Sequence, residues 1–440
     1  MVARTHLFSA VLLAAVSPFA LKSAHAADAV ITWNANAGVA ATKACIAPLD
    51  DPFHESRMYA MMHIAIHDAL NAIDRKFQPY TFDKKAEAGT SPDAAVAAAA
   101  HDVLDKTIAA LPSELVKKEC IDAGTASVEA AYKTAIDAIP DGPAKKQGIA
   151  LGQESAAAIL AKRADDHSTE GPFLNKNCPQ NVEAGKYQCT PGLPAYFIAF
   201  QVWENLTPFV LQDKTQFRPG PPFAVTDAKA RADIDEVKKL GGDGKTTPSA
   251  RTEDQTQIAL FWWESSPLKW SRIARTVATE KGLNMWDNAR LFALLDMALT
   301  DGYIAMVASK NYYNYWRPVT AIHSGGDTSW TPLVPTPPNQ DYPSGHSIEG
   351  GVGAEVLKQF FGTDQISFKD CGTMLPTGSS CGDPTPVLRT YTSFSQAAEE
   401  NAYSRILIGF HFRNATKEGN AYGHKIGERA ATLLPPVKTN

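Results

Sequence analysis

The sequence contains no CxxC pair of cysteines, no convincing run of alternating apolar and polar residues, and no internal repeat of fixed period. The missing CxxC argues against zinc ribbons and thioredoxin-like redox sites. The missing alternation argues against a half-buried β-sheet as the main architecture. Beyond the N-terminus, no apolar run reaches the roughly 18–20 residues of a spanning helix, so we expect no membrane span in the mature chain.

An excess of positive charge is also missing. The 440 residues include 42 Lys and Arg against 47 Asp and Glu, which gives a net charge of −5 at pH 7. A mildly acidic chain has no general attraction to nucleic acid or to an anionic membrane, and we expect neither as a partner. Any site for an anion must therefore be local.

The N-terminus is typical of a secretory signal peptide. A basic start precedes an apolar stretch over residues 7–21, and Ala24-His25-Ala26 matches an A-x-A cleavage site. We expect residues 1–26 to be removed and the mature protein to be periplasmic or secreted; an uncleaved anchor helix is the alternative. The removed segment carries two basic side chains and no acid, so the mature chain has a net charge of −7.

All six cysteines lie after this segment. An even number of cysteines in an exported chain favours disulfide bonds, although spacing alone does not fix their connectivity. Two close pairs each bracket a loop with glycine or proline, and the remaining two cysteines would form a long-range pair. The expected pairs are Cys178–Cys189, Cys371–Cys381 and Cys45–Cys120.

Apolar residues recur at three- and four-residue spacing along most of the chain, which is typical of amphipathic helices. We predict an all-α fold of two packed helical bundles, with residues 27–440 as one unit. Between residues 171 and 222, prolines, glycines and aromatic residues indicate an irregular ordered segment. Helices are predicted at 55–73, 92–111, 127–139, 147–165, 226–240, 269–280, 287–310, 345–361, 393–409 and 416–434.

The helix predicted at 55–73 contains His63 and His67, whose spacing of four residues places both on one face. Such a pair can supply two metal ligands. However, a third ligand and the general-base glutamate of a zinc protease are absent between them. Helix packing or surface exposure is therefore the favoured interpretation.

Three short segments in the last third of the chain carry cations and histidines. Lys310 and Arg317 are seven positions apart, so if 310–317 is helical both lie on one face and can converge on a small anion. In Pro343-Ser344-Gly345-His346, the glycine lets backbone N–H groups approach an anion, Ser344 adds a hydroxyl donor, and a helix begins.

The third segment contains Arg405, whose planar fork can bind two oxygens, and His411 six residues later. On an ideal helix this spacing puts them on different faces, so they would approach an anion from different directions. His346 would be the group that exchanges protons near neutral pH. Together the three segments predict a site for a tetrahedral oxyanion.

The order K-x6-RP, PSGH and SR-x5-H resembles the signature of the type 2 phosphatidic acid phosphatase (PAP2) and vanadium-dependent haloperoxidase superfamily. Other stretches resemble its secreted bacterial haloperoxidase-like branch, so the resemblance spans most of the mature chain. It implies a fold like that of the superfamily, with the anion site in the C-terminal bundle at about 268–435. These stretches are residues 57–73, 251–264, 289–305 and 315–323.

The resemblance also implies a role for each site residue. His346 resembles the acid–base histidine beside the apical oxygen, and Lys310 would assist catalysis. His411 resembles the histidine that is bonded to vanadium in peroxidases and forms the phosphohistidine in phosphatases. Vanadate adopts the shape of the phosphoryl-transfer transition state, so one site can serve both chemistries. The implied donors to the oxyanion are Lys310, Arg317, Ser344, Gly345 and Arg405.

Two activities follow from such a site. The first is a vanadate-dependent haloperoxidase that oxidises a halide, bromide in preference to chloride, with hydrogen peroxide; vanadium then acts as a Lewis acid. The second is a metal-free acid phosphatase that acts on phosphomonoesters through a phosphohistidine. A third interpretation, an oxyanion-binding protein without turnover, is disfavoured because the cations and both histidines are all present. All three take small molecules as partners, and an oligomer is compatible with each.

Some positions depart from the superfamily pattern. Phosphatases carry an aspartate four residues after the nucleophilic histidine, but this chain has Ala415 there, which weakens the phosphatase interpretation even if Asn414 partly substitutes. Asn339 stands where peroxidases often have an aromatic residue or histidine, and Val307 where a fungal-type enzyme has tryptophan. Chloride oxidation is therefore the weakest expectation. Asp341 and Arg413 are left outside the immediate site, since structural pairing explains both equally well.

Overall fold

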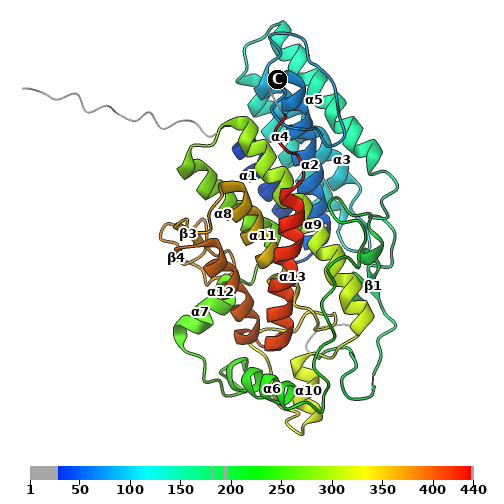
Figure 1. The fold of residues 1–440 in the computed structure, drawn as a ribbon, viewed down its shortest axis with the longest axis vertical. Coiled ribbons are helices and arrows are strands. Elements are labelled where there is room, and N and C mark those ends of the chain that lie inside the picture. The colour runs from blue at the N-terminus through cyan, green and yellow to red at the C-terminus, as the bar shows by residue number, and fades with distance from the viewer. Residues whose placement is uncertain (1–27, 181, 192–196, 438–440) are drawn as a thin grey trace, which may run out of the picture.

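The computed structural model describes residues 28–180, 182–191 and 197–437, and the expected signal peptide at 1–26 lies outside this part. The described residues form thirteen α-helices, one short 3₁₀ helix and two small two-stranded antiparallel sheets (Figure 1). The predicted all-α fold is therefore confirmed. The boundaries of the single unit at 27–440 stay a prediction.

The first five helices lie at one end of the molecule (Figure 1). Helix α2 begins after Asp51, whose side chain accepts the N–H of His54, and it has proline in its first turn. Alanines and glycines let these helices pack closely; a Cβ at Gly152 of α5 would collide with the backbone of α3. The bounds are α1 Ala29–Lys43, α2 Pro52–Ile73, α3 Pro92–Ala109, α4 Lys118–Asp137 and α5 Pro143–Lys162.

The remaining helices form the rest of the molecule and follow an irregular segment, whose described residues form β1 (Leu174–Asn175), β2 (Ile198–Ala199) and the 3₁₀ helix η1 (Gln201–Asn205). Strands β3 (Phe368–Cys371) and β4 (Leu388–Tyr391) pair beside α12 (Figure 1). The helix bounds are α6 Ala228–Leu240, α7 Glu253–Phe261, α8 Ser266–Lys281, α9 Met285–Tyr313, α10 Pro318–Ser324, α11 Gly345–Phe361, α12 Phe394–Leu407 and α13 Arg413–Ala431.

Helix α9 connects the two parts because it packs against α2 on one side and α11 and α13 on the other. Among the described helices it alone is long and apolar enough to cross a membrane, but its apolar window is completely buried within the molecule. Helices α11 and α13 pack against each other over their length. Glycines permit this approach, since a Cβ at Gly351 would collide with the backbone of Asn420 and one at Gly423 with that of Ile348.

The condition set for Lys310 and Arg317, that residues 310–317 are helical, is not met, and the helix predicted at 393–409 ends two residues earlier than expected. Residues 310–317 are not one helix, because α9 ends at Tyr313 and Asn314 takes a left-handed conformation with φ of 49°. Arg317 instead precedes α10 as its N-cap residue. The helix predicted to continue to residue 409 ends at Leu407, so His411 lies in a short loop rather than on the helix of Arg405. Helical spacing therefore does not set the geometry of either pair.

The three expected cysteine pairs are present as disulfides, with Cα atoms 5.3–5.7 Å apart. Two of them close loops of 10 and 11 residues in sequence separation, and the third spans 75 residues. The long-range bond fastens the end of α1 to the start of α4. It therefore holds the N-terminal helices together.

Candidate active site

Six of the seven predicted site residues line one cavity of about 390 Å³. They come from four places: the last turn of α9, the start of α10, the start of α11, and the end of α12 with the loop after it. We call these six residues the anion cradle; they are Lys310, Arg317, Gly345, His346, Arg405 and His411. Their roles in catalysis stay a prediction.

Ser344 is the seventh predicted residue, and it does not line the cavity. It is the N-cap of α11 and is fully buried. Its hydroxyl accepts a hydrogen bond of 2.9 Å from Ser347, and its backbone N–H donates to Ala415. The structure therefore gives Ser344 a part in fixing the turn, while Gly345 and His346 face the cavity.

His411 is held by two neighbours. Its Nδ1 lies 2.9 Å from Oδ1 of Asp341, and its Nε2 lies 2.9 Å from Nη1 of Arg317. When Asp341 is ionised it accepts the Nδ1 proton, so Nε2 carries the lone pair; this lone pair accepts a hydrogen bond from Nη1 of Arg317, and a ligand or an electrophile could take its place. Burial, with the charge of Arg317 second, lowers the pKa of His411 well below its ordinary value. The ring is therefore neutral and able to act as a nucleophile or metal ligand.

Arg317 is fixed by the loop that precedes the PSGH turn. Its Nε donates to the carbonyl of Asn339 and its Nη2 to the side-chain oxygen of Asn339, both at 2.7 Å. Its Nη1 donates to the carbonyl of Phe410 at 2.8 Å. Asn339 therefore orients the guanidinium of Arg317, a contact that the sequence did not reveal.

Lys310 is almost fully buried, and its ammonium donates to the backbone carbonyls of Gln340 and Asp341. Burial, and next the charge of Arg317, lower the pKa of Lys310 well below its ordinary value. An anion bound in the cavity would reverse this effect, because it would stabilise the charged ammonium.

Within the anion cradle, Arg405 has a side-chain donor without a partner. Its Nε donates to the hydroxyl of Ser404 at 2.9 Å, but its buried Nη1 has no hydrogen-bond partner. Burial, followed by the charge of Arg317, lowers the pKa of Arg405 to about 9. A buried guanidinium N–H without a partner is costly, and an oxyanion in the cavity would satisfy it.

His346 occupies the first turn of α11 and lies on the cavity wall. Its Nε2 lies 3.0 Å from the backbone carbonyl of Glu264, so that nitrogen carries the proton and Nδ1 is left to exchange protons with a ligand. Burial, then the charge of Arg405, lower the pKa of His346 to about 3. A bound anion would raise this pKa toward the range useful for acid–base catalysis.

The cradle has more positive than negative charge. Lys310, Arg317 and Arg405 are each 1–2% exposed, and Asp341 is the one carboxylate that contacts the cradle side chains among the described residues. Three buried cations facing one carboxylate repel one another in a medium of low dielectric. A bound anion would reduce this repulsion. A tetrahedral oxyanion could also accept hydrogen bonds from several of the cradle side chains.

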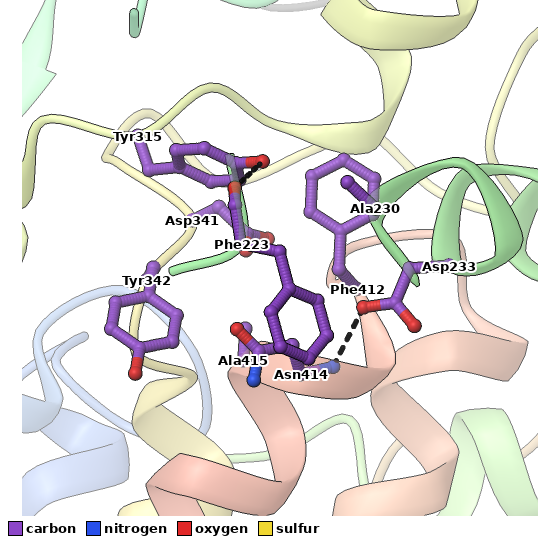
Figure 2. A pocket seen from close by; sticks show the side chains of 9 residues that line it. All are labelled: Phe223, Ala230, Asp233, Tyr315, Asp341, Tyr342, Phe412, Asn414 and Ala415. Carbon is purple, nitrogen blue, oxygen red and sulfur yellow. Dashed lines mark hydrogen bonds between the residues drawn. The ribbon is translucent and has the colours of Figure 1, made fainter. Parts of the chain in front are cut away.

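Asp341 contacts the cradle, although the sequence analysis left it outside the immediate site. It lines a small pocket of about 10 Å³ together with Ala415, Asn414 and Asp233 (Figure 2). Asp233 accepts the N–H of Asn414 at 2.9 Å, so it is not the partner of His411. The carboxylate expected at position 415 is thus supplied from position 341, 70 residues before the histidine it holds.

His63 and His67 are fully buried in α2 and take no part in this site. His63 Nδ1 lies 2.6 Å from Asp296, and His67 Nδ1 lies 3.0 Å from Asp68. Within the part of the chain that the structure describes, no group of three or more His, Cys, Asp or Glu could hold a metal ion. The packing interpretation of the two histidines agrees with these contacts.

Comparisons with known proteins bear on the fold and the family. A family model described as the VCPO second helical-bundle domain matches residues 290–436. The vanadium chloroperoxidase of Curvularia inaequalis is 23% identical over 461 residues, which cover 83% of this chain and 75% of that protein.

Two solved structures have a similar fold. The first bacterial vanadium-dependent iodoperoxidase aligns with a TM-score of 0.74 and 21% identity, over 93% of this chain and 97% of that one. An apo-type bacterial vanadium-dependent chloroperoxidase aligns with a TM-score of 0.68 and 14% identity, over 87% and 94%. The matched segment 290–436 contains every residue of the anion cradle.

Proposed function

We propose that this chain, which belongs to the vanadium haloperoxidase and PAP2 superfamily, is a vanadate-dependent haloperoxidase that oxidises bromide with hydrogen peroxide. One observation carries the proposal. Three buried cations surround a cavity in which Nη1 of Arg405 has no partner, and Nε2 of His411 is presented at the same wall. This donor set suits an oxyanion that also takes a nitrogen ligand.

The residues present fit vanadate. Its negative oxygens would be held by Lys310, Arg317 and Arg405, and the vanadium by Nε2 of His411. The unpartnered N–H of Arg405 and the uncompensated positive charge are both satisfied by such an anion. When bound, vanadate supplies Lewis-acid activation of peroxide without a change of its own oxidation state.

The side chains of this chain then have separable tasks. Asp341 holds the His411 ring so that Nε2 faces the cavity. Asn339 holds the guanidinium of Arg317 in place. His346 gives and takes protons at Nδ1 while its Nε2 is fixed by Glu264. The ammonium of Lys310 places positive charge where negative charge develops.

Bromide is the proposed halide because positions 339 and 307 lack the residues that the resemblance leads us to expect in a chloride-oxidising enzyme. Asn339 is engaged with Arg317, and Val307 is buried in the main apolar core rather than on the cavity wall. We propose a periplasmic or secreted location, which is supported by the three disulfides.

The test is a pair of assays on the purified protein. Bromination with peroxide is measured with and without orthovanadate, beside hydrolysis of p-nitrophenyl phosphate, and iodide and chloride are compared with bromide. We expect vanadate-dependent bromination that His411→Ala abolishes, by at least about a thousandfold. His424→Ala, a histidine on α13 that instead contacts Glu355, is the matched control and should retain activity. Hydrolysis without bromination would reject the proposal.

A phosphatase remains the second candidate, and the contact between Asp341 and His411 is the observation that favours it. Such a carboxylate orients a nucleophilic histidine and stabilises the imidazolium form. In this case Nε2 of His411 attacks a phosphomonoester, His346 protonates the leaving alcohol, and water hydrolyses the phosphohistidine. Orthovanadate would then inhibit the enzyme rather than activate it, which separates the two candidates in one titration.

A further inference from the structure

Arg317 lies at the end of a short segment between two helices. Helix α9 ends at Tyr313 and α10 begins at Pro318, so residues 314–316 lie outside both. Hydrogen bonds of the guanidinium orient the end of the Arg317 side chain, but they do not place the backbone from which it extends. The contacts of residues 314–316 therefore decide where this side chain begins.

Residues 185–187 pair with residues 314–316 in antiparallel directions. Two backbone N–H groups donate across the pairing, over 2.9 and 3.1 Å, and one bridge lies between them. The hydrogen bonds run from Tyr187 N–H to the Asn314 carbonyl and from Trp316 N–H to the Gly185 carbonyl, and the bridge joins Lys186 to Tyr315. A shift of 185–187 would therefore move the backbone that leads to Arg317.

The segment 185–187 is held in turn by the disulfide Cys178–Cys189. Tyr187 is fully buried and packs with both cysteines and Ile198 in a small apolar cluster separate from the main core. Burial raises the pKa of Tyr187 to about 12, while the charge of Arg317 acts in the opposite direction, so the phenol lies near the guanidinium. The described residues 182–189 form no helix or strand. A covalent bond across such a segment removes much of its conformational freedom.

A second disulfide, Cys45–Cys120, joins the end of α1 to the start of α4. Neither helix carries a residue of the anion cradle. Its cysteines are 75 residues apart in the sequence, whereas Cys178 and Cys189 are 11 apart. Closing the longer loop removes more entropy from the unfolded chain, so this bond should matter more for stability and less for the cradle.

We propose that the disulfide Cys178–Cys189 positions Arg317 through the pairing of 185–187 with 314–316, so that the affinity of the anion cradle for an oxyanion depends on this bond. The inference rests on the proposed function only in that the cradle binds an oxyanion. Neither cysteine lines the cavity, so the bond acts through Arg317 and not by contact with the anion. Its loss lets the guanidinium shift, and a displacement of about 1 Å is enough to weaken a contact severely.

Anion binding can be tested without any assay of turnover. Orthovanadate and phosphate are titrated by calorimetry into the unsubstituted protein and into two paired variants. Cys178→Ser with Cys189→Ser should bind both anions about tenfold more weakly. Cys45→Ser with Cys120→Ser is the matched control: its urea midpoint should fall further, while its anion affinity stays within about twofold of the unsubstituted protein. Equal anion affinity of the two variants would overturn the inference.

Arg317→Met decides whether the bond acts through the arginine. This substitution lowers anion affinity by itself. Adding Cys178→Ser and Cys189→Ser in that background should weaken binding by no more than about twofold, because changes that act through one group are not additive. A further loss of about tenfold would overturn the positioning role. Tyr187→Ala keeps the disulfide but removes the ring that packs on it, so it gives the same test if the paired variant does not fold: it should weaken anion binding, and unchanged affinity would contradict the inference.

Failure of the inference and failure of the proposed function are distinguishable. Phosphate binding that depends on Cys178–Cys189, without any bromination, supports the inference and rejects the haloperoxidase. Bromination with equal anion affinity in both paired variants overturns the inference alone. Absence of anion binding by the unsubstituted protein overturns both.

Discussion

Two clusters of buried charge lie next to each other in this protein, and they are neutralised in different ways. In the first, which we call the paired cluster, Lys269 and Arg272 of α8 face Glu264 and Asp370 with N···O distances of 2.6–3.1 Å. In the anion cradle, three cations face one carboxylate, and Nη1 of Arg405 has no partner. One cluster is complete within the chain, and the other needs something from outside.

The pKa values follow the same division. Burial alone would raise the pKa of Glu264 and of Asp370, but the charges of Arg272 and Lys269 lower both below their ordinary values. In the cradle, burial and the neighbouring cations act in the same direction on Lys310 and Arg405 and lower their pKa values. Complete pairing is typical of a structural cluster, and the incomplete pairing in the cradle is what the proposed anion site would require.

The largest effect should come from breaking the paired cluster. Asp370→Asn leaves Lys269 and Arg272 with one carboxylate, and we expect it to lower the free energy of unfolding by about 3–5 kcal/mol. Urea denaturation measures this change. Asp254→Asn, which breaks an exposed pair with Arg389, is the control and should cost less than about 1 kcal/mol. Equal effects of the two substitutions would contradict the view that the paired cluster is a structural cluster whose charges are complete within the chain.

The opposite result is expected in the anion cradle. Arg405→Met removes a cation that lacks a counter-ion, so the unfolding free energy of the anion-free protein should fall by less than about 1 kcal/mol. The affinity for orthovanadate or phosphate, measured by calorimetry, should fall about a hundredfold to a thousandfold because one donor to the oxyanion is lost. Unchanged anion affinity, or a stability loss as large as that of Asp370→Asn, would contradict the assignment.

Much of this architecture could be predicted from the sequence. Three- and four-residue periodicity is a local property, so helices such as 345–361 were predicted with the bounds that the structure shows. The cradle residues could be named because three short motifs occur in a fixed order. Their convergence on one cavity is what the structure adds.

The contacts that complete the site could not be predicted. The pairing of Asp341 with His411 joins two loops 70 residues apart, and no periodicity describes loops. The end of α9 depends on Asn314, which takes a left-handed conformation without glycine or proline as a signal. Asn339 was noticed only as a departure from a pattern, because its role depends on where Arg317 lies in space.

A third prediction concerns Asp341, the carboxylate that contacts the cradle. Asp341→Asn keeps the shape of the side chain but removes the carboxyl group that contacts Nδ1 of His411, so we expect bromination or hydrolysis to fall about tenfold to a hundredfold. Adding Ala415→Asp should restore part of the loss, since positions 341 and 415 border the same pocket (Figure 2). Asp233→Asn is the control, as Asp233 contacts Asn414 instead. Full activity in Asp341→Asn would show that His411 needs no such partner.

Glu55 shows a third way in which a buried carboxyl group is neutralised in this protein. Glu55 of α2 is fully buried and accepts a hydrogen bond of 2.9 Å from Tyr59, while its second oxygen has no partner. Burial raises the pKa of Glu55 to about 8, which means that the folded protein keeps this carboxyl protonated where the unfolded chain does not. A proton therefore neutralises this side chain, whereas cations of the chain neutralise the carboxylates of the paired cluster.

The sign of the pH effect follows from this proton. Between the ordinary pKa of 4.5 and about 8, the folded state binds the proton and the unfolded state has lost it, so stability falls as pH rises. Glu55→Gln mimics the neutral acid and removes this contribution. The unfolding free energy of the unsubstituted protein minus that of Glu55→Gln should therefore fall by up to about 1.4 kcal/mol per pH unit across this window. Glu399→Gln, at an exposed position of α12, should give no such slope, and parallel curves for Glu55→Gln would mean that Glu55 is ionised and paired after all.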